Sequence, residues 1–182
     1  MQTFLPYADF YSCSRVLDSK RLGKQRVECK QILLALKNGG AWSNHPAVKM
    51  WRGYEPALCR YAVCMCREWT ERGYVDNLFS FFPQYAKVTY PDWLGREDLH
   101  KSHRRALIYK GWCDAIWEAV RQHPEYRGKF KKSELTYSDY MVFNDYVNVD
   151  WTETEYSKLW PELLPSVPLA PNGSPPYVWP VQ

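Results

Sequence analysis

The sequence has no long apolar run, and this absence narrows the class of protein. No stretch of the 182 residues approaches the roughly 18 consecutive apolar residues of a membrane-spanning helix. The first ten residues, MQTFLPYADF, lack the basic flank and apolar core of a signal peptide. We therefore expect a cytoplasmic protein that has no contact with membranes.

The sequence also lacks the spacing of a metal site or a disulfide framework. It contains six cysteines but no C-x-x-C pair, and its four histidines do not complete a zinc pattern. Three of the cysteines crowd one stretch, at Cys59, Cys64 and Cys66, and the others are isolated. We expect reduced thiols that fill the core, and neither a metal nor a cofactor.

Charge is unevenly distributed along the chain. Residues 1–132 contain 23 basic and 13 acidic residues, whereas residues 133–182 contain 1 basic and 7 acidic residues. A basic body favours a polyanionic partner, because neutralising phosphates releases counterions. A merely soluble basic surface would carry the same charge, so the imbalance alone does not identify nucleic acid as the partner.

Three segments have the apolar periodicity of helices, at residues 17–37, 55–72 and 96–122. Aromatic residues make up 16% of the chain, which argues against disorder. We expect a mostly α fold: a compact single-domain bundle of about three main helices, with a long irregular C-terminal arm. Residues 1–129 would form the helical domain, and residues 130–182 an acidic, aromatic and proline-rich arm that packs on it.

The first predicted helix, LDSKRLGKQRVECKQILLALK, has an unusual polar stripe. Helical spacing places Glu28 among cations, with apolar flanks on both sides; Val27 and Leu34 form one of these flanks. The far side, which includes Arg26, would face solvent. Lys24 and Glu28 have the spacing of an ordinary i,i+4 ion pair, but the stripe also suits the lining of a site. Ser14, Asp18 or Ser19 would cap the helix, and Asn38 and the two glycines after it would end it.

Two further basic segments are candidate phosphate contacts. His45 precedes Pro46 at a predicted helix start, with Lys49 and Arg52 following within two turns; His45 would either cap that helix or help to bind phosphate. The first half of the third helix concentrates His100, His103, Arg104 and Arg105, which would be either phosphate contacts or a solvated face. We expect the aromatic connection at residues 73–95 to pack rather than to stack on bases.

Several motifs together resemble the pyrimidine dimer DNA glycosylase family, also called the phage endonuclease V type. They are VLDSKRLGKQRVE, NHPAVKMWRGYEPALCRYAVCMCREWTERGY, LHKSHRRAL and a terminal PPYVWP, which is typical of a bacterial and phage branch. The resemblance covers roughly residues 1–110 and the last few residues. It implies a helical domain that binds and kinks double-stranded DNA, extrudes a nucleotide, and acts as a glycosylase and abasic-site lyase.

The resemblance also implies the site residues. The family uses an N-terminal α-amino group as nucleophile and a glutamate of its first helix as the essential acid; here these fall on Met1 and Glu28. Because Gln2 is bulky, we expect Met1 to remain on the chain, so that its α-amino group is the candidate nucleophile. Lys24 is the other candidate nucleophile. The DNA-contacting positions of that helix in the family, and the family's histidine before the second helix, fall on Arg21, Lys24, Gln25, Arg26 and His45. From their charge and position in the sequence, we predict further DNA contacts at these residues: Lys20, Lys49, Arg52, His100, His103, Arg104 and Arg105.

Two alternatives to excision remain open from the sequence. One is a phage-type enzyme that modifies hypermodified thymine by adding or transferring an amine. The other is a non-catalytic DNA-binding module in which Glu28 is only structural. In each case we expect a monomer whose partner is double-stranded DNA, and whose acidic segment could occupy the basic surface when DNA is absent.

Overall fold

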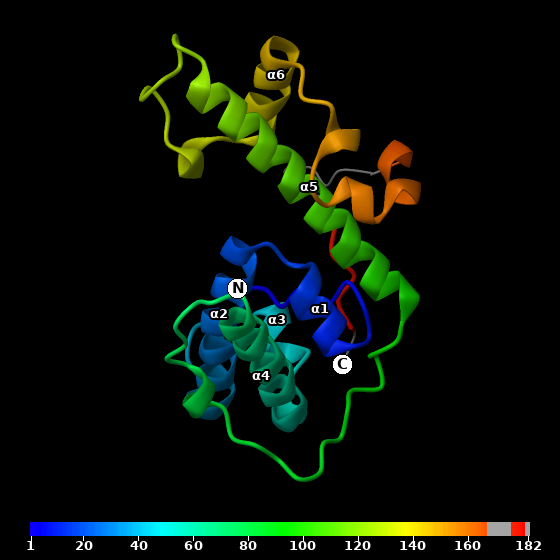
Figure 1. Cartoon of the computed structure of the whole chain (residues 1–182). Helices are drawn as coiled ribbons and strands as arrows, with labels where there is room; N and C mark the ends of the chain where they lie inside the picture. The colour runs from blue at the N-terminus through cyan, green and yellow to red at the C-terminus, as the bar shows by residue number, and fades with distance from the viewer. Residues whose placement is uncertain (167–175, 181–182) are drawn as a thin grey trace. The chain divides into compact units, whose positions relative to one another are not determined.

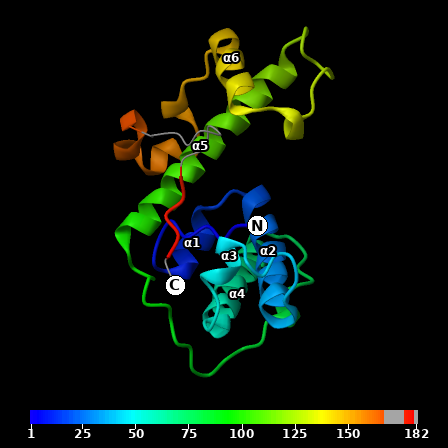
Figure 2. The ribbon, with the colours of Figure 1, turned by 180° about the vertical axis from the view of Figure 1, so that it is seen from behind.

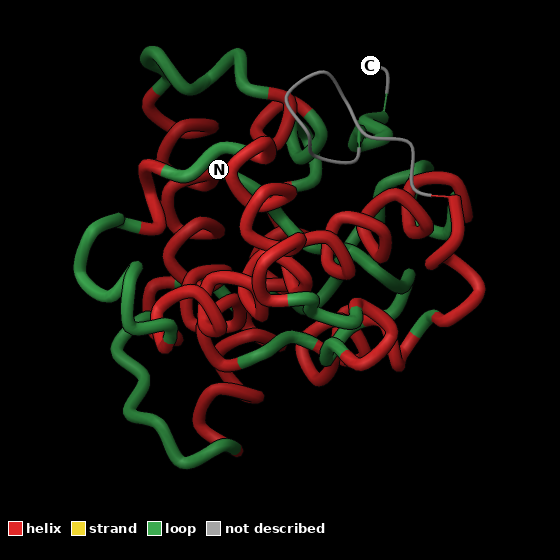
Figure 3. Tube along the Cα trace, turned by 90° about the horizontal axis from the view of Figure 1, so that it is seen from above, coloured by secondary structure: helices red, strands yellow, loops and turns green. Residues whose placement is uncertain are grey.

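Helices build this chain, as the sequence predicts. The computed structural model describes residues 1–166 and 176–180, and these contain six α-helices and no β-strand (Figure 3). The α-helices are α1 (Phe10–Val16), α2 (Ser19–Asn38), α3 (Pro46–Lys49), α4 (Glu55–Glu71), α5 (Glu97–Gln122) and α6 (Tyr137–Val147). Short 3₁₀ helices lie at Phe79–Phe81, Lys132–Glu134, Trp151–Glu153, Ser157–Leu159 and Pro161–Ser166. The predicted mostly α fold is confirmed.

The ends of α2 follow from its capping residues. The side chain of Asp18 accepts a hydrogen bond from the backbone N–H of Arg21 at 2.7 Å, which satisfies a donor that the first turn leaves free. At the other end Gly39 has φ 73°, and its N–H donates to the carbonyl of Ala35. Glycine adopts this conformation without steric cost, so the helix ends where the sequence predicts.

The chain divides into two compact units. The N-terminal unit comprises Met1–His100 together with the chain end from Trp179, and the C-terminal unit comprises Lys101–Val178. The division falls inside α5, between His100 and Lys101. Helices α1 to α4 all belong to the N-terminal unit and are gathered together in the views from the front and from behind (Figures 1 and 2).

In the N-terminal unit, α1 and α2 both pack against α4, which is the central helix. Its Tyr61 lies in an aromatic cluster with Phe10 and Trp51, at ring-centroid distances of 5.3 and 6.0 Å. Trp93, from the connection between α4 and α5, packs on Trp51 at 5.2 Å. The cluster fastens the start of the chain to α4, and it confirms the packing role predicted for Trp93.

Close contact between α2 and α4 depends on Gly23. A Cβ atom at this position would lie 3.1 Å from two ring atoms of Trp69, which is tighter than ordinary carbon contacts. The Trp69 ring cannot yield easily, because Tyr74 stacks on it at a centroid distance of 4.0 Å and the guanidinium of Arg26 lies 4.2 Å from its centroid. Gly23 therefore lets the two helices approach where Trp69 lies between them.

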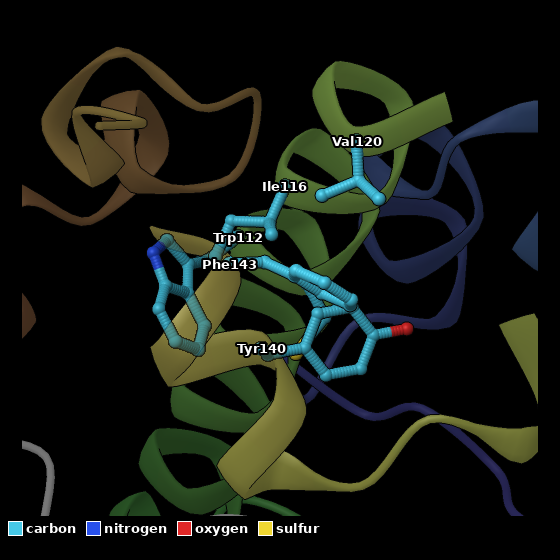
Figure 4. Packing of buried hydrophobic residues seen from close by; sticks show 6 residues of the cluster. Trp112, Ile116, Val120, Tyr140 and Phe143 are labelled. Carbon is cyan, nitrogen blue, oxygen red and sulfur yellow. The ribbon is translucent and has the colours of Figure 1, made fainter. Parts of the chain in front are cut away.

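The C-terminal unit has its own hydrophobic core, between α5 and α6 (Figure 4). Helix α5 contributes Trp112, Ile116 and Val120, and α6 contributes Tyr140 and Phe143, whose rings lie against them. All five are less than 9% exposed. The apolar face of α5 that these residues form is therefore buried by parts of the C-terminal unit, which do not belong to helices α1 to α4.

Helix α6 corrects the expectation that residues 130–182 form an irregular arm. It begins with a capping box, in which Thr136 and Asp139 exchange side-chain and backbone hydrogen bonds, and it ends at Asn148 with φ 46°. Its acidic and aromatic composition gives only a weak helical period, but Tyr140 and Phe143 lie one turn apart and bury the same face. The expectation for the proline-rich stretch at 167–175 lies outside the described residues.

No helix among the described residues is long and apolar enough to cross a membrane. All six cysteines are free thiols, and five of them are buried.

Candidate active site

The start of the chain is fastened to α2 by the buried side chain of Gln25. Its Oε1 atom accepts a hydrogen bond from the backbone N–H of Phe4 at 2.9 Å, and its Nε2 atom donates to the carbonyl of Gln2 at 2.9 Å. Nε2 also donates to Oε2 of Glu28 at 2.9 Å. One amide group thus links residues 2–4 to the acid of the predicted site.

The hydroxyl group of Tyr61, from α4, also helps to hold the side-chain amide of Gln25 in place. This hydroxyl lies 2.8 Å from Oε1 of Gln25 and 2.7 Å from the carbonyl oxygen of Phe4, both of which are acceptors. Burial raises the pKa of Tyr61 well above its usual range, so the hydroxyl keeps the proton that it donates to one of these oxygens. Gln25 is therefore held from three directions: the chain start, α2 and α4.

Glu28 is a buried carboxylate among hydrogen-bond donors and positive charges. Its side chain is 7% exposed, and Oε1 lies 3.7 Å from Nζ of Lys24. The carboxylate accepts hydrogen bonds from Gln25 and from the backbone N–H of Gln2. Burial raises the pKa of Glu28, and Lys24, the N-terminal amino group and these hydrogen bonds partly oppose that rise. A buried carboxyl group of raised pKa gives up its proton less readily than an exposed one, which suits a group that transfers protons in a reaction.

The N-terminal amino group lies near both Glu28 and His45. Its positive charge lowers the pKa of Glu28, and burial together with the same charge lowers the pKa of His45. Nδ1 of His45 accepts the backbone N–H of Ala47 at 3.1 Å, which caps α3 and leaves Nε2 to carry the proton of the neutral ring. The structure thus brings together the predicted residues Met1, Glu28, Lys24 and His45.

A cavity opens beside this group. It has a volume of about 490 Å³ and is bounded by Met1, by the C-terminal part of α2 and by the loop that follows, with these lining residues: Met1, Gln31, Leu34, Ala35, Asn38, Gly39, Gly40, Ala41 and Trp42. Trp42 is 58% exposed, and its ring centroid lies 5.8 Å from that of His45. The cavity therefore offers an open aromatic surface next to the amino group.

The solvent-facing side of α2 differs from the one predicted. The exposed residues of α2 are Lys20, Lys24, Val27, Gln31, Leu34, Lys37 and Asn38, so the prediction that Val27 and Leu34 form a buried flank is wrong. Two segments outside the helices add to the cover of α2: residues 2–4 lie over Gln25, and the segment containing Asp76 lies over Arg26. A helical wheel describes one helix only, so it could not reveal this additional cover.

The prediction that Arg26 faces solvent is wrong. Its guanidinium is buried, forms an ion pair with Asp76 and lies over the ring of Trp69. Burial alone would raise the pKa of Asp76, but hydrogen bonds from the N–H groups of Phe79 and Leu78 and from Arg26 lower it overall. Arg26 therefore supports the fold, and Gln25 is also withdrawn from the surface on which DNA contacts were expected.

The remaining cations near the site stay accessible to a ligand. Lys20, Lys49 and Arg52 are exposed, and a nitrogen of Arg52 donates to the carbonyl of Ser43 at 3.0 Å. Arg21 is less available, because its side chain is only 12% exposed and forms an ion pair with Asp18. These residues lie on α2 and around α3, and the two helices pack together.

The predicted basic face of the third helix is largely buried. In the N-terminal unit, Nε2 of His100 accepts the N–H of Gly95 at 3.1 Å and Nδ1 donates to the carbonyl of Leu5 at 2.8 Å, so this histidine is a neutral structural group. In the C-terminal unit His103 and Arg104 are buried and Arg105 is half-buried. The helical spacing could not show this, because the buried side of α5 changes along its length.

Sequence reasoning missed Gln2, Tyr61 and Trp42. Tyr61 belongs to the apolar face of the helix predicted at residues 55–72, and its hydrogen bonds across α2 and α4 leave no periodic signal. The exposed Trp42 in a glycine-flanked loop was a usable signal for a ligand surface. Within residues 1–166 and 176–180, no group of three or more histidine, cysteine or acidic side chains is arranged to hold a metal ion.

Comparison with known proteins supports the resemblance seen in the sequence. A search of curated proteins and a search of solved structures each returned no match. Residues 1–80, which hold all of the converging side chains described above, match the pyrimidine dimer DNA glycosylase family.

Proposed function

We propose that this chain, whose residues 1–80 match the pyrimidine dimer DNA glycosylase family, excises a damaged or modified pyrimidine from double-stranded DNA and then cleaves the abasic strand through an imine. One observation carries this proposal: Gln25 bonds both the backbone of Gln2 and the buried carboxylate of Glu28, which holds the chain start against this acid, and Met1 lines an open cavity. An amine next to a carboxyl group of raised pKa is the combination that this chemistry needs.

In the first step, the neutral amine of Met1 attacks C1′ of the deoxyribose. A bond forms between the amine nitrogen and C1′, the bond from C1′ to the base breaks, and the base leaves with the electron pair and takes up a proton. The sugar ring then opens as O4′ is protonated, which gives a protonated imine. Glu28, next to the amine, would stabilise the cationic sugar and transfer these protons.

The second step cleaves the strand. A base removes a proton from C2′, the electrons form a double bond between C2′ and C3′, and the phosphate on C3′ leaves. Glu28 in its ionised form is the acceptor that the site offers for this proton, since Gln25 and the N–H of Gln2 fix the carboxylate in place. The cavity beside Met1 would receive the extruded nucleotide, with Trp42 as a stacking surface.

Lys20, Arg21, Lys49 and Arg52 would position the duplex by contacts to phosphates, because they lie on α2 and around α3 beside the site. Lys24 is the competing nucleophile. Its side chain is 72% exposed and its ammonium lies 3.7 Å from Glu28, so it is well placed to support the carboxylate electrostatically. Burial, which converts a lysine into a neutral nucleophile, is absent here.

Borohydride trapping on a duplex with one abasic site tests the proposal. We expect a covalent adduct whose modified peptide contains the Met1 amine, with Lys24→Gln still trapped and with Lys20→Gln as the matched control. An adduct on Lys24 would transfer the role of nucleophile to that lysine. Failure of the duplex-bound protein to form any adduct would refute the lyase and favour base modification or binding alone.

Glu28→Gln tests the acid. Because the amide keeps the shape but cannot transfer a proton, we expect excision to fall by two to four orders of magnitude, roughly the range of general acid–base catalysis. Duplex affinity should stay the same or rise, since a negative charge near DNA is removed. Wild-type activity in this variant, on a substrate that the protein excises, would rule out Glu28 as the catalytic acid.

A further inference from the structure

The loop between α5 and α6 is the basic part of a mostly acidic region. Residues 123–132, HPEYRGKFKK, contain four lysines and arginines and one acid, whereas residues 133–182 contain one lysine and seven acids. Gly128, with φ 77°, reverses the chain in the middle of this loop. The reversal places Arg127 and Lys129 on either side of a tight turn, which Lys129 closes by donating its N–H to the carbonyl of Tyr126 at 3.1 Å.

Aromatic rings connect this loop to α6. Tyr126 lies 5.2 Å from Phe143 and 6.2 Å from Tyr146, between ring centroids, and Phe130 lies 5.5 Å from Phe143. Phe143 is buried in the core of the unit and anchors the group. Phe130 and Tyr146, in contrast, are 40% and 64% exposed. The rings of Phe130 and Tyr146 are therefore held in place by contacts that lead to the buried Phe143, and they remain open to a ligand.

The cations of the loop are largely available. Among residues 1–166 and 176–180, neither Arg127 nor Lys129 has a side-chain hydrogen bond or ion pair, and both are exposed. Lys131 pairs with Glu134 at 3.2 Å, but its side chain is 79% exposed, so water screens this contact. Lys132 forms an ion pair with Asp114 and holds the loop against α5.

We propose that Arg127, Lys129, Phe130 and Tyr146 form a binding surface for a single strand of nucleic acid. Exposed rings supply stacking for unpaired bases, and the unpaired cations supply contacts to the phosphates between them. A duplex would use the cations but not the rings, since its bases are already stacked. The surface lies in the C-terminal unit, outside the residues that match the glycosylase family, and does not depend on the chemistry of Glu28.

The experiment measures fluorescence anisotropy of the full-length protein with a labelled 20-nucleotide oligo-dT. The comparison ligand is a strand of equal length that carries abasic spacers, which has the phosphates without the bases. We expect the wild type to prefer oligo-dT, and Tyr146→Ser to lower affinity for oligo-dT about fivefold or more while leaving the abasic strand unaffected.

Charge is tested with the double variant Arg127→Ser and Lys129→Ser. If each residue neutralises one phosphate, the slope of log affinity against log salt should become shallower by about 1.4 for a single strand. Lys158→Ser is the matched control, because Lys158 is an exposed cation of the same unit that pairs with Glu153. The proposal is overturned if the double variant changes the slope no more than this control. It is also overturned if Tyr146→Ser weakens both ligands equally, or if poly-glutamate competes as well as oligo-dT.

Discussion

At the scale of single residues, Gln25 determines how the amine and the acid of the site face each other. Both atoms of its amide group are used: Oε1 for the chain start and the Tyr61 hydroxyl, and Nε2 for Gln2 and Glu28. An amide that is fully hydrogen-bonded in a buried setting is costly to alter, since each lost contact leaves a buried partner unsatisfied. Gln25 is therefore a positioning residue for the proposed reaction.

We predict that Gln25→Leu shifts the pH dependence of excision. The hydrogen bond from Gln25 lowers the pKa of Glu28, so its loss raises that pKa further. If the ionised carboxylate is required, the acidic limb of the pH–rate profile moves to higher pH, and the rate falls at every pH along that limb. Stopped assays across the pH range, with duplex affinity measured in parallel, would show the shift.

The control for this prediction is Tyr61→Phe, which removes a hydroxyl that contacts Gln25 but not Glu28. Its pH profile should stay near that of the wild type even if stability falls, because a buried hydrogen-bond partner is lost. If Gln25→Leu loses activity with an unmoved pH profile, Gln25 acts through folding alone.

At the scale of elements, the sequence predicted α2, α4 and α5 to within two residues, because long apolar periods define them and α2 also has clear caps at both ends. It missed α6, although Thr136 and Asp139 have the spacing of a capping box. Within the site it identified Glu28 and Lys24 as a polar stripe. It could not identify Gln25 and Arg26 as buried, because their partners, Phe4 and Asp76, come from distant segments that no periodicity relates to α2.

The approach of α2 to α4 leads to a stability prediction for Gly23→Ala. In an exposed helix this change stabilises by about 1 kcal/mol. Here the new Cβ would press on Trp69, whose indole N–H is also bonded to the carbonyl of Val75 at 3.0 Å. Overpacking of this kind costs about 1–3 kcal/mol, so we expect a net loss of about 1 kcal/mol in the free energy of unfolding by urea.

Trp69→Leu provides the matching test, because it removes the two ring atoms that the Cβ would meet. In that background Gly23→Ala should become neutral or stabilising, and the two changes should show coupling in a double-mutant cycle. A Gly23→Ala protein that is more stable than the wild type would mean that Trp69 can move aside.

At the scale of the whole molecule, the uneven distribution of charge along the chain leads to a hypothesis about how DNA binding is regulated. The acids of residues 133–163 belong to the C-terminal unit, and the basic residues of the proposed active site belong to the N-terminal unit. An acidic segment of the same chain could compete with DNA for a basic surface. Deleting the segment would be a poor test, because it would remove Tyr140 and Phe143 from the core of the unit.

We therefore predict the effect of neutralising three exposed acids, with Asp145→Asn, Glu155→Gln and Glu162→Gln. If the acids compete with DNA, association with duplex should become faster by roughly tenfold at low salt, and the gain should shrink as added salt screens the charges. Stopped-flow binding would measure this. Asp145→Glu with Glu155→Asp is the control that keeps the charge, and equal rates for the two variants would eliminate the competition.

The attachment of residues 2–4 to Gln25 also has a consequence for how the protein is produced and assayed. Because Met1 lines the cavity, any group joined to its amine would, in the proposed reaction, occupy the space that the extruded nucleotide needs and would turn the nitrogen into an amide. A retained formyl group, an acetyl group or an N-terminal purification tag would each have this effect. Such preparations should bind DNA yet form no imine, and removal of the blocking group should restore trapping without any refolding.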